Sequence, residues 1–288
     1  MKTFVHNDFV CPVDGLALLQ KDRSLTCAKK HVYDLAREGY CNLLLVQQKA
    51  TLDPGDSKEM VSARRRFLDG GYFAPIADKL FKRISEIASK KKDTPLRIVD
   101  AGCGEGYYLD HLEKLAKKDK NSAAIALAGF DISKWAIKSA AKRSNAIAWA
   151  VASNKQLPFA PRSVDIILST FGFPIWESFK AVQPAGGRVL LVEPGAEHLI
   201  ELRKIIYPNV NDAVSTSFKV AQAAGYELTS ESPHKFPITL SNNPRIQDLL
   251  SMTPHAFKVD QARRENLKTL DQFVVTVDVT FRELRLVR

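Results

Sequence analysis

Ile98-Val99-Asp100-Ala101-Gly102-Cys103-Gly104-Glu105-Gly106 is the stretch of this 288-residue chain that decides its fold. Its first half is apolar and predicts a buried strand, and its second half alternates glycine with other residues. Glycine lets the backbone turn sharply and lets a ligand approach closely, as at the first strand-to-helix turn of a doubly wound sheet. A dinucleotide site would place its third glycine at position 107, which is Tyr107 here. The stretch therefore predicts the loop of a cofactor that has no phosphate to cradle, or a tight turn without a ligand.

Strand and helix signals alternate after this stretch in the order that a parallel sheet requires. Ser133 suits the start of a helix, because its hydroxyl can accept an unpaired amide of the first turn. Gly225 suits the end of a later helix, where a left-handed cap favours glycine. We expect strands at residues 96–100, 124–131, 147–152, 164–170 and 188–193, and helices at residues 106–118, 133–143 and 211–224.

The last part of the chain predicts an antiparallel edge for this sheet. Residues 272–286 alternate apolar and polar side chains, which is typical of a strand with one buried face. A strand near residues 236–240 could pair with it, as in the antiparallel pair that closes many methyltransferase sheets. The predicted fold class is therefore α/β, a Rossmann-like doubly wound sheet with an antiparallel final strand, and in this it resembles the class I methyltransferase fold.

Acidic residues occur where such a sheet would place the parts of an S-adenosylmethionine (AdoMet) site. Asp131 closes the second strand, where a carboxylate can accept both ribose hydroxyls, although it could instead only cap the next helix. Asp100 and Glu105 can face the cationic methionine end of AdoMet, and Ser153 ends a strand beside the adenine. The cofactor-binding residues predicted from these strand ends are Asp100, Gly102, Gly104, Glu105, Gly106, Asp131 and Ser153.

The composition limits the kinds of partner and compartment. A formal charge of +10 and a pI near 9.4 favour a polyanionic partner, with nucleic acid ahead of a membrane. No apolar run approaches the length of a membrane span, and Lys2, His6, Asn7 and Asp8 interrupt any signal-peptide core. Four cysteines in a chain of this size do not predict a disulfide framework, so we expect a cytoplasmic protein.

The N-terminal residues resemble two halves of a small zinc-binding module. Zinc prefers four tetrahedral nitrogen or sulfur ligands in two short pairs, and the pairs here are C-x-x-D and C-x-x-x-H. The predicted ligands are Cys11, Asp14, Cys27 and His31, with Cys41 as a substitute if the chain folds back. An aspartate in place of a soft thiolate should lower the affinity for zinc. The alternative is a knuckle without metal, in which the cysteines are buried as small apolar residues.

Taken together, these features resemble the bacterial 23S ribosomal RNA guanine-N1 methyltransferases of the RlmA type, over nearly the whole chain. Apart from the glycine loop, the resemblance rests on the Cys11 to His31 module, Arg37-Glu38-Gly39-Tyr40-Cys41-Asn42-Leu43-Leu44, Asp53-Pro54-Gly55-Asp56-Ser57, Ala63-Arg64-Arg65-Arg66-Phe67-Leu68-Asp69-Gly70-Gly71-Tyr72, Asp131-Ile132-Ser133-Lys134, Pro194-Gly195 with His198-Leu199, and Met252-Thr253-Pro254.

The resemblance implies methyl transfer from AdoMet to guanine N1 in a hairpin of 23S ribosomal RNA. It implies that Tyr72, Gly104, Glu105 and His198 contact AdoMet, and that the zinc module helps to recognise RNA. The family has a cysteine where this chain has Asp14, so that position departs from the pattern.

Guanine N1 carries a proton at neutral pH, so its methylation benefits from a positioned proton acceptor. Glu193 is the catalytic base that we predict first, ahead of Asp165 and His198. N1 lies on the Watson–Crick edge, so the guanine must be in a loop or flipped out of a duplex. Residues 171–174 are expected to shape the base pocket. We expect basic residues to bind the phosphates of the RNA and aromatic rings to stack on its bases. The candidates are Arg64-Arg65-Arg66 with Phe67 and Tyr72, Lys29-Lys30, and Lys90-Lys91-Lys92.

We divide the chain into an N-terminal zinc-ribbon-like module (1–45), a helical linker region (46–93) and a methyltransferase domain (94–288). Two other functions stay open at this point. One is methylation of a small molecule, because a fold does not fix a substrate. The other is a nonenzymatic RNA-binding or assembly role on a methyltransferase fold. The sequence also leaves open whether the protein forms a homodimer.

Overall fold

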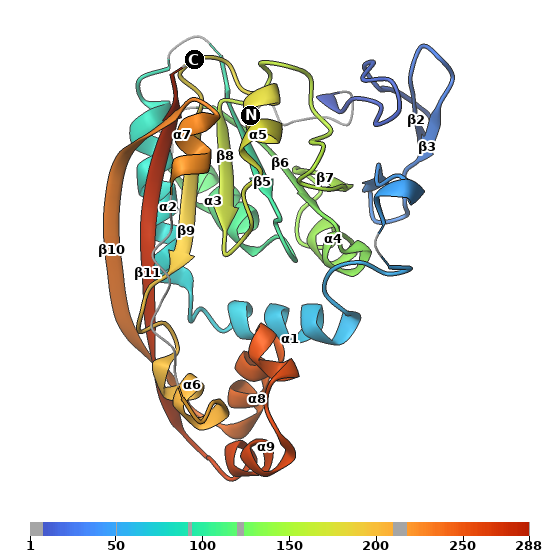
Figure 1. Cartoon of the computed structure of the whole chain (residues 1–288). Coiled ribbons are helices and arrows are strands. Elements are labelled where there is room, and N and C mark those ends of the chain that lie inside the picture. The colour runs from blue at the N-terminus through green and yellow to red at the C-terminus, as the bar shows by residue number, and fades with distance from the viewer. Residues whose placement is uncertain (1–7, 50, 92–93, 120–123, 210–217, 288) are drawn as a thin grey trace.

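A computed structural model describes residues 8–49, 51–91, 94–119, 124–209 and 218–287 of the chain (Figure 1). Its main sheet has the strand order β10-β11-β9-β8-β5-β6-β7-β4, in which β4 to β9 run parallel and β10 and β11 are antiparallel to their neighbours. The strands are β4 (Cys41–Asn42), β5 (Leu96–Ala101), β6 (Ile125–Asp131), β7 (Ala148–Val151), β8 (Ile166–Thr170), β9 (Arg188–Pro194), β10 (Tyr226–Leu240) and β11 (Phe273–Leu286).

Helices cover both faces of this sheet, because its central strands are buried on both sides. One apolar cluster joins the sheet to α1, α2, α3, α4 and α8, and a second joins its other face to α5, α7 and the N-terminal residues. The helices are α1 (Lys58–Asp69), α2 (Ala74–Ala88), α3 (Tyr107–Lys118), α4 (Lys134–Ala141), α5 (Trp176–Val182), α6 (Ile200–Ile206), α7 (Lys219–Ala223), α8 (Asn243–Ser251) and α9 (Gln261–Lys268), with short 3-10 turns η2 (Val46–Gln48) and η3 (Pro254–Phe257).

The predicted α/β sheet with its antiparallel final strand is confirmed, and Ser133 caps α4 by accepting the Ala136 amide at 3.2 Å. β10 is far longer than the expected strand at 236–240, since it pairs with almost the whole of β11. It tolerates Pro233 and Pro237 because it is the edge strand, where a missing amide breaks no inner ladder. The helix expected at residues 211–224 appears as the shorter helix α7. Residues 211–217 of the expected helix lie outside the part of the chain that the structure describes.

Helices lie across the carboxyl ends of the central strands (Figure 1). Of these, α1 begins at its N-cap Ser57, which accepts the Met60 amide, and packs against α8. Arg66 of α1 binds the buried carboxylate of Asp248 in α8, with Nε 3.0 Å from Oδ1. The strand ends therefore face a helical cover rather than open solvent.

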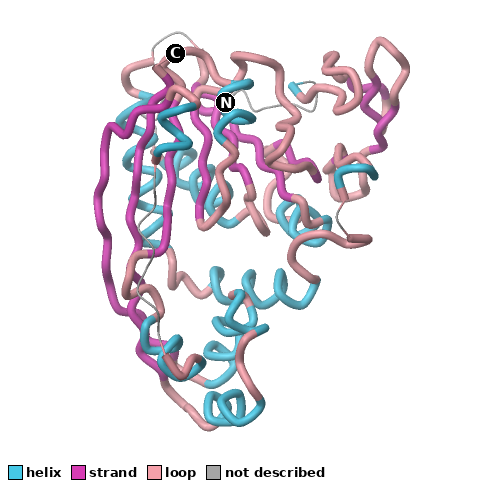
Figure 2. Tube along the Cα trace, viewed as in Figure 1, coloured by secondary structure: helices cyan, strands magenta, loops and turns pink. Residues whose placement is uncertain are grey.

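The N-terminal residues form a three-stranded antiparallel sheet of β1 (Leu19–Lys21), β2 (Ser24–Thr26) and β3 (Val32–Asp34), which Figure 2 shows beside the main sheet. It docks on the main sheet, because β4 pairs with β7 and the Val10 amide donates to the Pro158 carbonyl at 3.0 Å. Within the described ranges, none of the helices combines the length and apolar character needed to cross a bilayer.

Candidate active site and metal centre

The glycine loop connects β5 to α3, and its three glycines all have positive φ, at 84° for Gly102, 54° for Gly104 and 85° for Gly106. A side chain at Gly106 would place its Cβ 2.8 Å from Ala140 Cβ and 2.8 Å from the Trp149 ring. A Cβ on Gly102 would meet no described atom within 4 Å. Gly106 is therefore needed for helix packing, whereas Gly102 borders open space where a ligand can approach the backbone.

Asp100, at the end of β5, is buried to 1% exposure, and neither of its carboxylate oxygens has a hydrogen-bond partner among the described residues. Burial raises its pKa to about 8, and the nearby Asp131 carboxylate adds to that increase. A buried carboxylate without a partner is costly, and a bound cation would remove that cost. The arrangement fits the ammonium group at the methionine end of AdoMet.

Two hydroxyls on the neighbouring strand share this property. Ser169 and Thr170 end β8, which pairs with β5, and their buried side-chain oxygens also lack partners among the described residues. Our sequence prediction missed both residues. The signal was present, because these two hydroxyls interrupt the apolar run Ile166-Ile167-Leu168 at a strand end. Together with Asp100 they form a polar end to two adjacent strands, which fits a polar ligand.

Asp131 holds the glycine loop against the end of β6. Its Oδ2 accepts the Gly104 amide at 3.0 Å and its Oδ1 accepts the Ser133 amide at 2.8 Å, so it also supports the start of α4. Burial raises the pKa of this carboxyl group. A carboxylate has about four acceptor sites, so ribose hydroxyls can still bind beside these two amides. Ser153 is buried at the end of the next strand, where its Oγ accepts the Lys155 amide at 3.2 Å.

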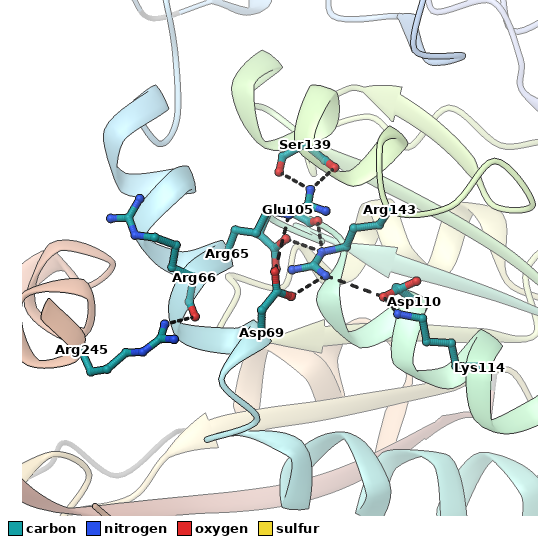
Figure 3. Close-up of polar contacts among 9 residues, drawn as sticks. All are labelled: Arg65, Arg66, Asp69, Glu105, Asp110, Lys114, Ser139, Arg143 and Arg245. Atoms are coloured by element: carbon teal, nitrogen blue, oxygen red, sulfur yellow. Dashed lines mark hydrogen bonds and ion pairs between the residues drawn. The ribbon is translucent and has the colours of Figure 1, made fainter. Parts of the chain in front are cut away.

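Glu105 differs from our expectation that its carboxylate faces the methionine end of AdoMet. Figure 3 shows it bound by Arg143, which donates from Nε to the carboxylate and also to the Glu105 carbonyl at 3.1 Å. Arg143 Nη1 reaches Asp69 of α1 at 2.8 Å and Asp110 of α3 at 3.7 Å. Because the side chains of Arg143 and Glu105 are both buried, each charge needs the other as its partner. The main chain of Glu105 is the part that we still propose as a cofactor contact.

An aromatic cluster connects Tyr72 with His198. The Phe67 ring lies 4.8 Å from Tyr72 and 5.2 Å from Phe73, and Phe171 lies 5.9 Å from Phe73 and 5.5 Å from His198. The cluster thus brings together Phe67 of α1 with residues that follow α1, β8 and β9, including two of the cofactor contacts implied by the resemblance. Phe171 has a φ of 55°, a strained conformation for a bulky residue that is often found at functional sites.

His198 offers a hydrogen-bond donor rather than a base. Its Nδ1 accepts the Asp278 amide at 3.3 Å, which leaves the proton on Nε2. Burial lowers the pKa of the imidazole to about 4, so the ring is neutral at physiological pH. His198 is therefore unsuited to the role of proton acceptor that the sequence left open for it.

The other two candidate bases lie at opposite ends of their strands. Asp165 precedes β8, at the amino end of the sheet, where Lys91 Nζ and the Arg97 amide bind it at 2.7 and 2.8 Å. It is thus at the wrong edge for catalysis, and that candidate is wrong. Glu193 lies near the carboxyl end of β9 and pairs with Arg282 at 2.7 Å. Glu193 stays a prediction.

The run Arg64-Arg65-Arg66 is bound within the protein rather than free for phosphates. Arg64 pairs with Asp56 and donates to the Met252 carbonyl at 2.9 Å, Arg65 donates to the Ser139 carbonyl at 2.9 Å, and Arg66 binds Asp248. Phe67 is fully buried and cannot stack on a base. The three arginines instead fix α1 over the glycine loop, with Arg64 Nη1 3.7 Å from the position of a Cβ on Gly104.

The four predicted metal ligands come together in the N-terminal module, with their ligand atoms all within 4.8 Å of one another. His31 Nδ1 lies 3.4 Å from the sulfurs of Cys11 and Cys27 and 3.0 Å from Asp14 Oδ2, which is 3.3 Å from Cys27 Sγ. Ligands of tetrahedral zinc would be about 3.3 to 3.8 Å apart, given the usual zinc–ligand bond lengths. The donor set therefore fits one structural zinc.

Cys41 is not part of this cluster. It lies buried in β4 with its sulfur directed to the Trp149 carbonyl at 3.9 Å, so the suggestion that it could replace a ligand is wrong. Lys29 and Lys30 beside the cluster are exposed, as phosphate-binding residues would need to be.

Comparisons with known proteins agree with this geometry. Residues 9–52 match the family model described as RlmA, N-terminal, and residues 98–195 match a methyltransferase domain model. The chain is 31% identical over 193 residues to the Streptomyces fradiae "23S rRNA (guanine(748)-N(1))-methyltransferase", covering 67% of this chain and 65% of that protein. It is 32% identical over 279 residues to the Bacillus subtilis (strain 168) protein named "Putative 23S rRNA (guanine-N(1)-)-methyltransferase YxjB", covering 94% of each. This chain therefore belongs to the family of the 23S rRNA (guanine-N1)-methyltransferases.

Proposed function

We propose that this protein transfers the methyl group of AdoMet to N1 of a guanine in a hairpin of 23S ribosomal RNA. The observation that carries the proposal is the buried, unpartnered Asp100 beside the open side of the glycine loop, in a chain aligned over 94% of its length with such a relative. The buried Asp100 supports a cationic cofactor, and the alignment with the relative supports the RNA substrate.

The residues divide the work of binding and alignment. When bound, AdoMet would supply a methyl carbon that its sulfonium sulfur activates toward attack by guanine N1, with the neutral thioether as the leaving group. Asp100 would hold the methionine ammonium and Asp131 the ribose, while the glycine loop keeps side chains away from the cofactor. Placing donor and acceptor in line can supply on the order of 7 kcal/mol of the barrier. The cofactor contacts are proposed for Tyr72, Asp100, Gly102, Gly104, Glu105, Gly106, Asp131, Ser153 and His198.

The proton of guanine N1 must leave during the reaction. We propose Glu193 as its acceptor, because it is a carboxylate near the carboxyl end of β9. Arg282 would have to release or share that carboxylate. His198, with a proton on Nε2, can donate a hydrogen bond to an oxygen of the base or of the cofactor.

The N-terminal module is the proposed RNA-recognition element, with Lys29 and Lys30 as phosphate contacts. In the same proposal residues 1–45 are that module, 46–93 a helical linker region and 94–288 the catalytic domain, acting in the cytoplasm. Methylation of a small molecule and a nonenzymatic role are not favoured by the rRNA-methylating relatives. Sedimentation of the purified protein would show whether it acts as a homodimer.

Labelled AdoMet, purified protein and 23S rRNA test the function directly. We expect label in the RNA and a reverse-transcription stop at one guanine, because a methyl group on N1 blocks base pairing. The Asp100→Asn variant, which keeps the side-chain shape, should transfer little label. Transfer to a metabolite extract and not to RNA would favour the small-molecule enzyme, and no transfer to either would favour the nonenzymatic role.

A further inference from the structure

Residues 153–159, which follow β7 and are called the bridging segment below, connect the metal module with the catalytic sheet. On the module side, Pro158 accepts the Val10 amide at 3.0 Å, and Gln156 Nε2 donates to the Pro12 carbonyl at 3.0 Å. These two partners are the residues on either side of the metal ligand Cys11. The bridging segment therefore holds the main chain of a metal ligand from both sides.

Buried aromatic rings continue this connection into the sheet. Phe9 of the module lies 5.3 Å from Phe159 of the bridging segment, and Phe159 lies 6.3 Å from Phe130. Phe130 directly precedes Asp131, and all three rings are buried. Closely packed side chains transmit displacement, so a shift of the module would be felt at the end of β6.

The bridging segment also binds the loop that follows β8 and the helix α5 after it. Asn154 Nδ2 donates to the Phe173 carbonyl at 3.0 Å, and the Lys155 carbonyl accepts Ser178 Oγ at 2.7 Å. The Phe173 side chain is 86% exposed, as a ring that stacks on a base must be in the absence of RNA. Its neighbour Phe171 has the strained φ of 55° noted above, and such a conformation persists only where surrounding contacts hold it.

We propose that the bridging segment is a positioning element through which the metal-loaded module fixes residues 171–174, with Asn154 as the positioning residue. Zinc would fix Cys11, the contacts of Val10 and Pro12 would fix the bridging segment, and Asn154 would fix the Phe173 carbonyl. The naming of residues 171–174 as a wall for the target base rests on the proposed function. The mechanical connection rests only on the contacts given above.

Hydrogen exchange on the full chain tests the connection without any assay of activity. Zinc-loaded protein is compared with protein treated with a chelator, and the β10–β11 pair serves as the internal reference. We expect amides in 153–159 and 171–174 to exchange roughly fivefold faster or more after chelation, as for the loss of an ordinary hydrogen bond. Unchanged exchange in both segments would overturn the proposal.

Two variants separate the connection from general unfolding. Gln156→Ala removes the Pro12 contact without touching a ligand, and should keep zinc at full content while exchange in 171–174 rises. Asn154→Ala should raise exchange in 171–174. It should also raise KM for RNA or lower kcat, while the affinity for the demethylated cofactor S-adenosylhomocysteine (AdoHcy) stays within about twofold. Gln48→Ala is the matched control, because it removes only an exposed hydrogen bond of the bridging segment, from Gln48 Nε2 to Gln156 Oε1 at 2.9 Å. This variant should leave exchange in 171–174 unchanged.

The outcomes distinguish this proposal from the function. Exchange that responds as expected in a protein without methylation of 23S rRNA would contradict the function and leave the connection standing. Normal kinetics and exchange in Asn154→Ala, in a protein that methylates 23S rRNA, would overturn the connection alone.

Discussion

Asp100 shows how one residue connects burial to cofactor binding. Its pKa is about 8 in the free protein, so it is mostly protonated at pH 7, and a bound ammonium would favour the charged form. We therefore predict that binding of AdoHcy at pH 7 releases most of one proton, and that the release disappears above about pH 9. Calorimetry in two buffers with different ionisation enthalpies measures this. Asp100→Asn should bind weakly with no proton release, and equal release in both proteins would contradict the assignment.

The same pKa makes a prediction about stability. The carboxyl group of an unfolded aspartate has a pKa near 3.9, whereas burial raises that of folded Asp100 to about 8. The folded state therefore binds the proton more tightly, and this residue's contribution to the free energy of unfolding falls as the pH rises from about 4 to 8. At pH 9 the ligand-free Asp100→Asn variant should be more stable than the wild type, by about a few kcal/mol. Urea denaturation at pH 5 and pH 9 checks this, and a difference that does not grow with pH would refute it.

At this scale the sequence predicted residues whose role is local and missed those whose role depends on distant partners. The positive φ of the three glycines, the Asp131 contact with the Ser133 amide and the Ser133 cap of α4 are local features, so spacing identified these residues. Their longer contacts, such as that of Asp131 with the Gly104 amide, were not predicted. Arg143 was missed because its partner Glu105 lies 38 residues away and no short pattern joins the two. The tautomer of His198 depends on a main-chain amide of β11 and has no signal in sequence.

At the scale of elements, the glycine loop separates packing from ligand access. Gly106→Ala would push a Cβ into Ala140 and Trp149 at positive φ, so we expect a loss of about 2 to 4 kcal/mol in the free energy of unfolding. Gly102→Ala meets open space and should cost only about 1 kcal/mol, but its methyl group would occupy the approach to the cofactor. Urea denaturation and AdoHcy calorimetry together distinguish the two. Equal effects of the two substitutions on both measurements would contradict this division.

The charged network around Arg143 in Figure 3 ties α1 and α3 to the glycine loop, and its effect can be divided by a double-mutant cycle. Arg143→Met leaves Glu105 buried without its charged partner, so we expect a loss of roughly 3 to 5 kcal/mol in stability. Adding Glu105→Gln should restore much of that stability, because the neutral pair carries no buried charge. AdoHcy affinity should stay low in the double variant, since the loop is no longer held. Full recovery of affinity along with stability would show that the network acts on stability alone.

The basic run on α1 shows why a charge pattern is an uncertain guide to function. Arg66 binds Asp248, which is 182 residues away, and Arg65 binds Ser139, 74 residues away. A sequence shows the three arginines but not the groups opposite them. Their observed partners make α1 a cover for the glycine loop, so substitutions here should reduce AdoHcy affinity as well as any affinity for RNA.

At the scale of the whole molecule, the alternation of strands and helices predicted the parallel sheet. The apolar–polar alternation of residues 272–286, together with the likeness to methyltransferase sheets, predicted its antiparallel edge. The relation of the N-terminal module to that sheet was not predictable, because it depends on β4 pairing with β7 and on contacts with residues 156–159. These pairings join positions more than 100 residues apart, and no local pattern encodes them. The module therefore looks like a separate unit in sequence, whereas in the structure it shares a buried core with the sheet.

This shared core leads to a prediction for the metal. Leu18 and Leu25 of the module pack in the same buried cluster as Val99 and Val189 of the sheet. Removal of zinc should therefore lower the melting temperature of the chain in one transition, rather than create a separate early transition for the module. Asp14→Cys should require a stronger or more concentrated chelator for the same shift, because a thiolate binds zinc more tightly than a carboxylate oxygen does. Calorimetry over a chelator series checks both, with the exposed Val13→Ala as control. A second, low-temperature transition would mean that the module folds independently, and that the catalytic sheet does not depend on its metal.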